Sequence, residues 1–272
     1  MHLHLKGGLS ETKTFLTGRD GALDLVKARA GGFLGGFFAV YIPSPIDKEF
    51  KIDEMTKAFY DLPLPDAIDW ESALPTAMAI IAILFDLENK DALKVCRSVS
   101  DIQNTLAKDK ISAILHLEGA EAIDKDLQTL EVLYQAGLRS LGPVWSRPNI
   151  FGHGVPFRYP SNPDIGPGLT EHGIRLIKRC NKLGIMVDVS HLNAAGFWDV
   201  ANQSDRPLVA THSNVHAICP HSRNLTDDQL TAIKESDGMV GLNFAAAFLR
   251  EDGRMIADVK LDQMLRHLDY LI

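Results

Sequence analysis

Cysteine is scarce in this sequence, with only three residues in 272. Cys96, Cys180 and Cys219 are far apart and form no Cys-x-x-Cys pair. This pattern argues against a disulfide framework and against a zinc site built on thiolates. We therefore expect three reduced thiols, most of them buried.

A cluster of basic charge is also missing. The chain has 28 Lys and Arg residues against 35 Asp and Glu residues, which gives a net charge of -7. Proteins that bind nucleic acid carry a basic patch or stripe. The sequence therefore predicts no DNA or RNA partner.

Long hydrophobic runs are lacking as well. The longest, "AMAIIAILF" at residues 77–85, is too short to cross a bilayer, and the opening "MHLHLKGGLS" has no apolar signal core. These absences favour a cytoplasmic protein and give no sign of a transmembrane segment.

Apolar residues make up 46% of the chain, enough for a large core. Six apolar, strand-like runs alternate with helix-like segments, and they cover residues 35–42, 111–118, 138–145, 185–190, 207–213 and 238–244. Near-continuous apolar strands joined by helices indicate a parallel sheet covered on both faces. The sequence therefore predicts the α/β class.

Side chains that cap helices mark three of the connecting segments. Thr170 opens a periodic segment that stops at Gly184, and Thr226 opens one that stops near Gly238. Asn193 has the position of a helix cap just after His191. We expect a helix after each of these three residues.

An open doubly wound sheet and a closed barrel both fit this alternation. No glycine-rich phosphate loop follows a strand, and polar residues fall at several strand ends, which favours a single (β/α)8 TIM barrel over residues 1–272. Only six strands are found, no strand precedes Gly35, and the chain ends in the helical pattern "MLRHLDYLI". We therefore expect the first and last strands to lie outside this sequence. The sheet edges would then be exposed, which predicts poor solubility or association. The cellular compartment stays open, because a targeting segment could lie outside this sequence as well.

Three chemically active side chains stand at predicted strand ends. His191 and His212 end two matching runs 21 residues apart, and Glu118 ends a third run just before Gly119. Two imidazoles and a carboxylate on one barrel rim form a ligand set suited to zinc or a similar ion. Each residue alone also fits an ordinary hydrogen-bonded rim position. His116 shares the strand face of Glu118, one layer deeper.

Five segments, in order and spacing, resemble the renal (membrane) dipeptidase family of zinc-dependent barrel metallopeptidases. They are "LHLEGAEAI", "GLRSLGPVW", "GIMVDVSHLN", "LVATHSNVHAICPHSRNLTDDQL" and "GMVGLNF". The resemblance covers nearly the whole chain and implies hydrolysis of dipeptides by a water activated between two Zn²⁺ ions. It further implies that Glu118 bridges both ions, and that His191 and His212 bind the second.

The resemblance also implies that Arg223 grips the terminal carboxylate of the substrate, which suits a planar guanidinium. A solvated arginine just before a helix is the alternative. The His-x-Asp pair at the end of the family's first strand and its acid/base aspartate after the last strand are absent. His2 and His4 fall past the expected pair, so we expect no ligand role for them. This chain is thus expected to bind at most one metal weakly and to lack activity.

Trp145 occupies the position where animal members of the family carry a substrate-contacting histidine. The segment 145–168 is long and rich in Pro and Gly, which is typical of a lid, a binding loop or disorder. His153 in this segment is a candidate to fold back and contact substrate, and a plain surface histidine is the alternative.

Two other functions remain open. One is an amidohydrolase-like barrel that acts on lactones, phosphoesters or cyclic amides, and the other is a non-catalytic homologue that serves as a binding module. The absence of a lysine suited to carboxylation at a strand end favours the dipeptidase. The expected partners are small peptides and, from the family's tendency to dimerise, a second copy of the chain.

Overall fold

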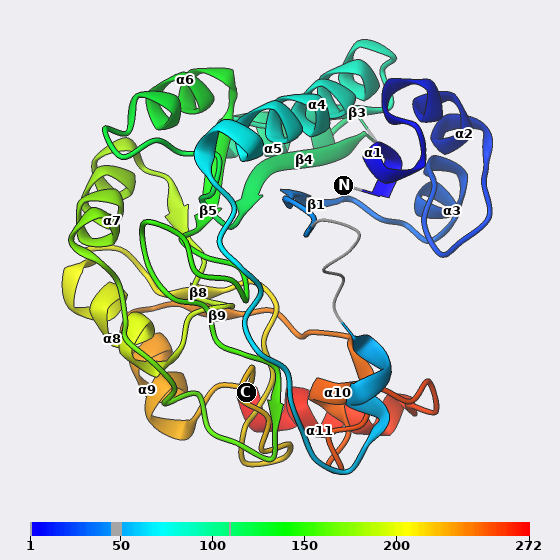
Figure 1. The fold of residues 1–272 in the computed structure, drawn as a ribbon. Coiled ribbons are helices and arrows are strands. Elements are labelled where there is room, and N and C mark those ends of the chain that lie inside the picture. The colour runs from blue at the N-terminus through cyan, green and yellow to red at the C-terminus, as the bar shows by residue number, and fades with distance from the viewer. Residues whose placement is uncertain (1, 45–50, 109) are drawn as a thin grey trace. The chain divides into compact units, whose positions relative to one another are not determined.

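The computed structural model describes residues 2–44, 51–108 and 110–272 (Figure 1). The chain has two compact units, and each is described by itself. Unit 1 comprises Met1–Ile42 and Asp69–Leu141, and unit 2 comprises Pro43–Ile68 and Gly142–Ile272. That the chain is a single barrel domain, and that its outer strands are missing, stay predictions.

Unit 1 is built on parallel strands. Its strand order is β1 (Gly35–Val40), β4 (Ile111–Glu118) and β5 (Leu138–Gly142), and β3 (Leu93–Val95) also pairs with β4. The β1 register sets Gly35 opposite Ser112, a close approach in which a side chain on Gly35 would collide with the Ser112 backbone. Six of the eight β4 residues are buried, on both faces of the strand, as expected for a covered parallel sheet.

Helices cover these strands. Helix α4 (Trp70–Asn89) contacts β1 and β3, and α5 (Val99–Leu106) contacts β4 (Figure 1). The N-terminal segment also folds into short helices instead of a strand. The remaining helices of unit 1 are α1 (His2–Lys6), η1 (Gly8–Glu11), α2 (Thr12–Thr17), α3 (Leu25–Ala30) and α6 (Gln128–Ala136).

Helix α4 contains the apolar run of residues 77–85 and extends it. The helix has 20 residues and contains an 18-residue window with a mean hydropathy of 1.4, so by length and composition it could span a membrane. The core helix of a globular protein meets the same criteria, and Ile80, Ile81 and Leu84 are among the buried residues of α4. This finding is weak evidence for a span.

Unit 2 contains a second set of parallel strands. Strand β8 (Val209–Ala210) pairs with β9 (Met239–Val240), and Asp188, just after β7 (Met186–Val187), bridges to Val209. The six apolar runs of the sequence thus all contain strands, and the α/β class is confirmed. Strand β3 was missed because it has three residues and the middle one, Lys94, is exposed.

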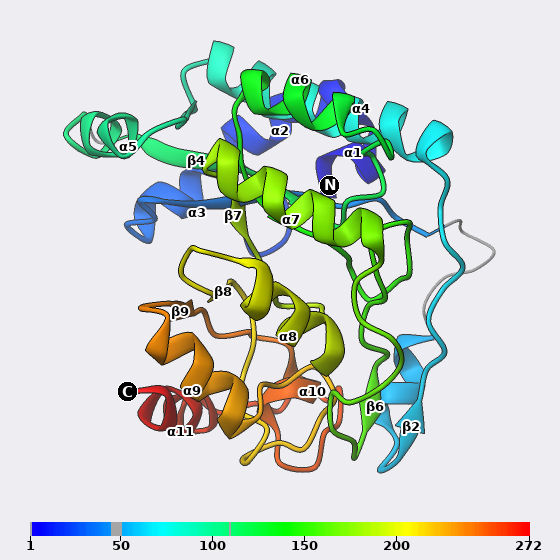
Figure 2. The same ribbon diagram turned by 90° about the vertical axis from the view of Figure 1, so that its left-hand side faces the viewer.

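The predicted helix caps of unit 2 are confirmed. Thr170, Asn193 and Thr226 each accept a hydrogen bond from a backbone N–H three residues on. The capped helices are α7 (Glu171–Leu183), α8 (Ala194–Gln203) and α9 (Asp227–Glu235). Helices α7 and α8 pack together, and α9 packs on β9 (Figure 2).

An apolar cluster forms a further part of the unit 2 core. It combines η3 (Ile52–Thr56), the antiparallel pair of β2 (Tyr60–Asp61) with β6 (Arg158–Tyr159), and α10 (Ala246–Leu249). Helix α11 (Leu261–Leu271) contacts α10. Burial of each large apolar side chain contributes about 1.5–3 kcal/mol to the free energy of folding. This cluster therefore stabilises the packing of these segments against one another.

Candidate metal centre

His191 and His212 face one another in unit 2. His191 follows β7 and is 6% exposed, and His212 follows β8 with a side chain that is 27% exposed. Their Nε2 atoms lie 2.9 Å apart, and their ring centroids lie 4.9 Å apart. The two runs that match in sequence thus deliver their imidazoles to one place.

The outer ring nitrogen of His212 is held by a hydroxyl. Thr211 Oγ1 lies 2.7 Å from His212 Nδ1 and donates its own proton to Asp188 Oδ2 at 2.5 Å. A threonine hydroxyl has one proton, so its oxygen accepts the bond from His212 Nδ1–H. The Nε2 atom of His212 therefore carries a lone pair directed at His191.

Asp188 organises the backbone under this pair. The carboxylate is buried and accepts from Ser190 N at 3.0 Å, Ser190 Oγ at 2.6 Å and Thr211 N at 3.0 Å. Ser190 Oγ in turn accepts from His212 N at 3.1 Å. On the other ring, Ser146 Oγ lies 3.0 Å from His191 Nδ1. Both histidines thus have an anchored Nδ1 and an inward Nε2, the arrangement typical of metal-binding histidines.

Arg223 lies beside the histidine pair rather than in solvent. Its side chain is 3% exposed, Nη2 is 3.4 Å from His191 Nε2, and the guanidinium donates to Ser190 O and to His212 O. Its guanidinium carbon also lies 5.6 Å from the ring centroid of Phe248. The alternative of a solvated arginine is therefore wrong, and the substrate-binding role of Arg223 stays a prediction.

The segment 145–168 folds onto the same region. The Trp145 ring lies 5.7 Å from the His191 ring, Gly154 bridges to Leu192, and Val155 N donates to His191 O at 2.9 Å. A side chain on Gly154 would collide with the Trp145 carbonyl, so this approach requires glycine. The segment has a defined backbone rather than the character of a disordered loop.

The other candidate residues are placed as follows. His153 is half-buried next to Gly154, and its role in substrate contact stays a prediction. The backbone of His2 and His4 lies in α1, and the expectation that neither binds a metal stays a prediction. In unit 1, Glu118 is the last residue of β4, and the chain turns away at Gly119 with φ +102°.

His116 is a core histidine of unit 1. It is 3% exposed, its Nδ1 lies 2.8 Å from Ser140 Oγ on β5, and its ring meets the edge of Phe37. This burial agrees with its expected place one layer below Glu118.

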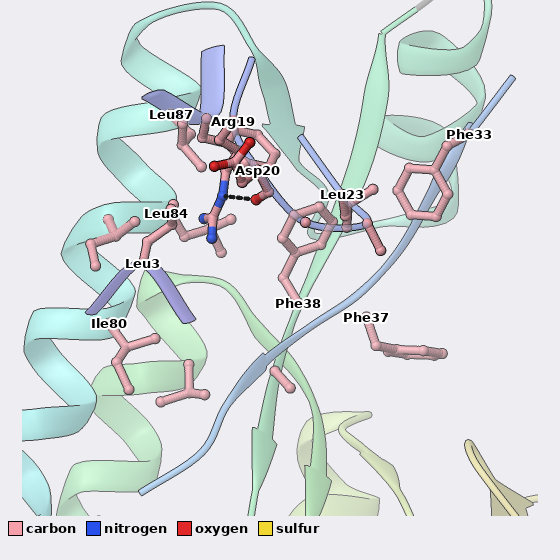
Figure 3. A pocket seen from close by; sticks show the side chains of 16 residues that line it. Leu3, Arg19, Asp20, Leu23, Phe33, Phe37, Phe38, Ile80, Leu84 and Leu87 are labelled. Carbon is pink, nitrogen blue, oxygen red and sulfur yellow. Dashed lines mark hydrogen bonds between the residues drawn. The ribbon is translucent and has the colours of Figure 1, made fainter. Parts of the chain in front are cut away.

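A separate apolar cavity of about 440 Å³ occupies unit 1 (Figure 3). Phe37 and Phe38 of β1 line it together with Ile80 and Leu84 of α4. Its lining has one carboxylate, Asp20, and no histidine or cysteine among the residues that the structure describes. It therefore lacks the ligand atoms that a metal ion needs. We do not assign the catalytic site to this cavity on its volume alone.

Three residues that hold the histidine rings were not predicted from the sequence. Asp188, Ser146 and Thr211 carry the anchoring contacts, and each is a polar residue next to an apolar run or directly beside a candidate histidine. The signal was a hydroxyl or carboxylate one to three residues before a strand-end histidine in "DVSH" and "ATHS".

Comparisons with known proteins agree with this geometry. The family model described as membrane dipeptidase (peptidase family M19) matches residues 2–272. An uncharacterised protein of Acinetobacter calcoaceticus is 43% identical over 257 residues, which is 93% of this chain and 79% of that protein.

Two solved structures are similar over the whole chain. A metallopeptidase from Rhodobacter sphaeroides, solved with a phosphinate mimic of the dipeptide L-Ala-D-Ala, is 51% identical with a TM-score of 0.96, covering 100% of this chain and 78% of that one. A structure described as a dipeptidase of family M19 is also 51% identical, with a TM-score of 0.95 and the same coverage. The fold of this chain is therefore the TIM-barrel-like α/β fold of these enzymes. The chain belongs to the membrane dipeptidase family of metallopeptidases, peptidase family M19.

Proposed function

We propose that the protein hydrolyses dipeptides at a divalent metal site whose ligands include Glu118, His191 and His212. The observation that carries the proposal is the 2.9 Å approach of the two Nε2 atoms, each on a ring whose Nδ1 is anchored. Neutral imidazole nitrogens and a carboxylate are the donors that zinc prefers at catalytic sites. The residues of the chain therefore fit a metal.

Such an ion supplies Lewis acidity, which lowers the pKa of a water and polarises a carbonyl. The family resemblance supports two ions, and Glu118, His191 and His212 would be among the residues that hold them. We assign no acid/base residue within this chain.

Arg223 is proposed to bind the free carboxylate of the dipeptide. A buried guanidinium next to His191 favours a ligand with a negative group at short range from the bond to be cleaved. In a dipeptide the carboxylate is separated from the peptide carbonyl by a single residue. This short span limits the substrate to short peptides, and the dipeptide mimic bound to the Rhodobacter sphaeroides enzyme supports the same class.

Thr211 and Asp188 are proposed to keep His212 in the tautomer that ligation needs. The Asp188 carboxylate accepts a hydrogen bond from the Thr211 hydroxyl, and the threonine oxygen in turn accepts one from His212 Nδ1–H. This arrangement leaves Nε2 as a lone-pair donor without rotation of the ring.

The test replaces Glu118 by Ala in the intact protein. Both zinc retention and dipeptide hydrolysis should be lost, whereas Glu131→Ala, a change on α6, should leave both intact. Metal content is measured after dialysis, and turnover is measured with dipeptides, lactones and phosphoesters. Retained zinc with undiminished turnover contradicts the proposal, and hydrolysis of lactones or phosphoesters alone would favour the other amidohydrolase-like function.

A further inference from the structure

His221 is a buried histidine that the proposed metal site does not use. It is 0% exposed and lies in the aromatic cluster of unit 2, with ring centroids 4.6 Å from Phe248, 5.8 Å from Tyr60, 6.3 Å from Phe157 and 6.4 Å from Tyr159. Burial of a polar ring among aromatic side chains costs free energy unless the ring makes hydrogen bonds.

One ring nitrogen of His221 makes a specific contact. Its Nδ1 accepts a hydrogen bond from the backbone N–H of Arg223 at 2.9 Å. An accepting Nδ1 leaves the proton of the neutral ring on Nε2. Within the described parts of the chain Nε2 has no hydrogen-bond partner, and aromatic faces surround the ring.

The environment keeps His221 neutral. Burial, and then the charges of Arg223 and His216, hold its pKa well below the usual 6.5. A protonated ring has no acceptor at Nδ1. The neutral state is therefore the one that can receive the Arg223 amide.

Arg223 is consequently fixed at both ends. Its backbone amide is held by His221, and its guanidinium lies over Phe248 and donates to Ser190 O and His212 O. The Phe248 ring contacts the side chains of both His221 and Arg223. The aromatic cluster therefore helps to hold the backbone and the guanidinium of Arg223 in place.

We propose that His221 is a positioning residue for substrate: it orients Arg223 to receive the terminal carboxylate of a dipeptide. The inference rests on the proposed carboxylate role of Arg223 and adds a determinant of specificity outside the metal ligands. It predicts that loss of the Nδ1 acceptor weakens recognition of the free carboxylate while the chemical step continues.

Two substitutions separate the acceptor from the packing. His221→Phe keeps an aromatic ring but removes the acceptor, whereas His221→Asn keeps an acceptor that reaches the N–H two residues on, as in an Asx-turn. The probes are one dipeptide and its C-terminal amide, which lacks the carboxylate. The readout is the ratio of kcat/KM for acid over amide, together with the Kd of a phosphinate dipeptide analogue.

We expect His221→Phe to lower the acid-over-amide ratio about 3- to 10-fold through KM, since one hydrogen bond is lost. The Kd of the analogue should rise by a similar factor, with kcat for the amide unchanged. His221→Asn should restore both values to within about twofold. An unchanged ratio in His221→Phe, or a drop of equal size in His221→Asn, overturns the inference.

Arg223→Met distinguishes a failure of the positioning role of His221 from a failure of the proposed carboxylate-binding role of Arg223. If Arg223→Met leaves the ratio unchanged, the carboxylate role itself is wrong, and the inference falls with it. If Arg223→Met abolishes the preference and His221→Phe does not alter it, only the positioning role is wrong. Should His221→Phe fail to fold, His221→Leu takes its place, because it also removes the Nδ1 acceptor, and an unchanged ratio there contradicts the inference.

Discussion

Unit 2 uses histidine in two opposite ways. At the strand ends, His191 and His212 have hydroxyl groups at Nδ1 and direct Nε2 at each other, within a network centred on Asp188. In the aromatic cluster, His221 has its Nδ1 occupied by a backbone amide and its Nε2 among rings. The surroundings of the ring thus decide whether a histidine offers a lone pair to an ion or to its own backbone.

The largest expected effect comes from removal of a strand-end ring. His212→Ala should reduce dipeptide turnover by about 1000-fold or more, because the site loses a proposed ligand and binding of the metal is weakened or lost. His172→Ala, a change on α7, is the matched control and should keep turnover within about twofold. Steady-state kinetics measures both, and a similar mild loss in the two variants would remove the distinction between ligand and ordinary histidine.

A smaller effect is expected from the carboxylate behind the ring. Asp188→Asn should lower zinc affinity by about 10- to 100-fold, the range found when a group that orients a ligand is changed. Asp199→Asn is the control, since the Asp199 carboxylate accepts from Leu169 N on another part of unit 2. Competition with a chelator gives both affinities. An unaltered affinity in Asp188→Asn would show that the Thr211 contact alone fixes His212.

The smallest effect concerns stability in mild acid. Because burial holds the folded pKa of His221 below 6.5, the unfolded chain binds more protons as pH falls below about 6.5, and the free energy of unfolding decreases. His221→Asn removes this titration, so its stability should fall less between about pH 7.5 and pH 5 than that of the wild type. His267, whose pKa is also lowered by burial, contributes equally to both proteins. Urea unfolding at the two pH values makes the measurement, and parallel losses would contradict the stated burial effect.

Much of the fold could be predicted from the sequence because hydrophobic periodicity is a local signal. The six apolar runs contain strands, and Thr170, Asn193 and Thr226 cap helices where expected. The short β3 strand could not be found, since "LKV" has too few residues to show alternation. Pairing of distant segments such as β2 with β6 depends on tertiary packing that leaves no periodic trace.

Candidate site residues could be selected from the sequence where strand ends carry unusual side chains. His191, His212 and Glu118 stood out because titratable side chains rarely end buried runs. Asp188 did not, since one acidic residue inside "IMVDVS" resembles an interruption of a strand rather than the centre of a hydrogen-bond network. His221 could not be found at all, because nothing in "CPHSRN" distinguishes a buried ring from a solvated one.

The most direct test of the metal site is anomalous X-ray scattering at the zinc edge from crystals of the zinc-loaded protein. We expect an anomalous peak within bonding distance, about 2.0–2.1 Å, of the Nε2 atoms of both His191 and His212. Zinc bound elsewhere, with no peak at these two nitrogens, would contradict the proposed metal site.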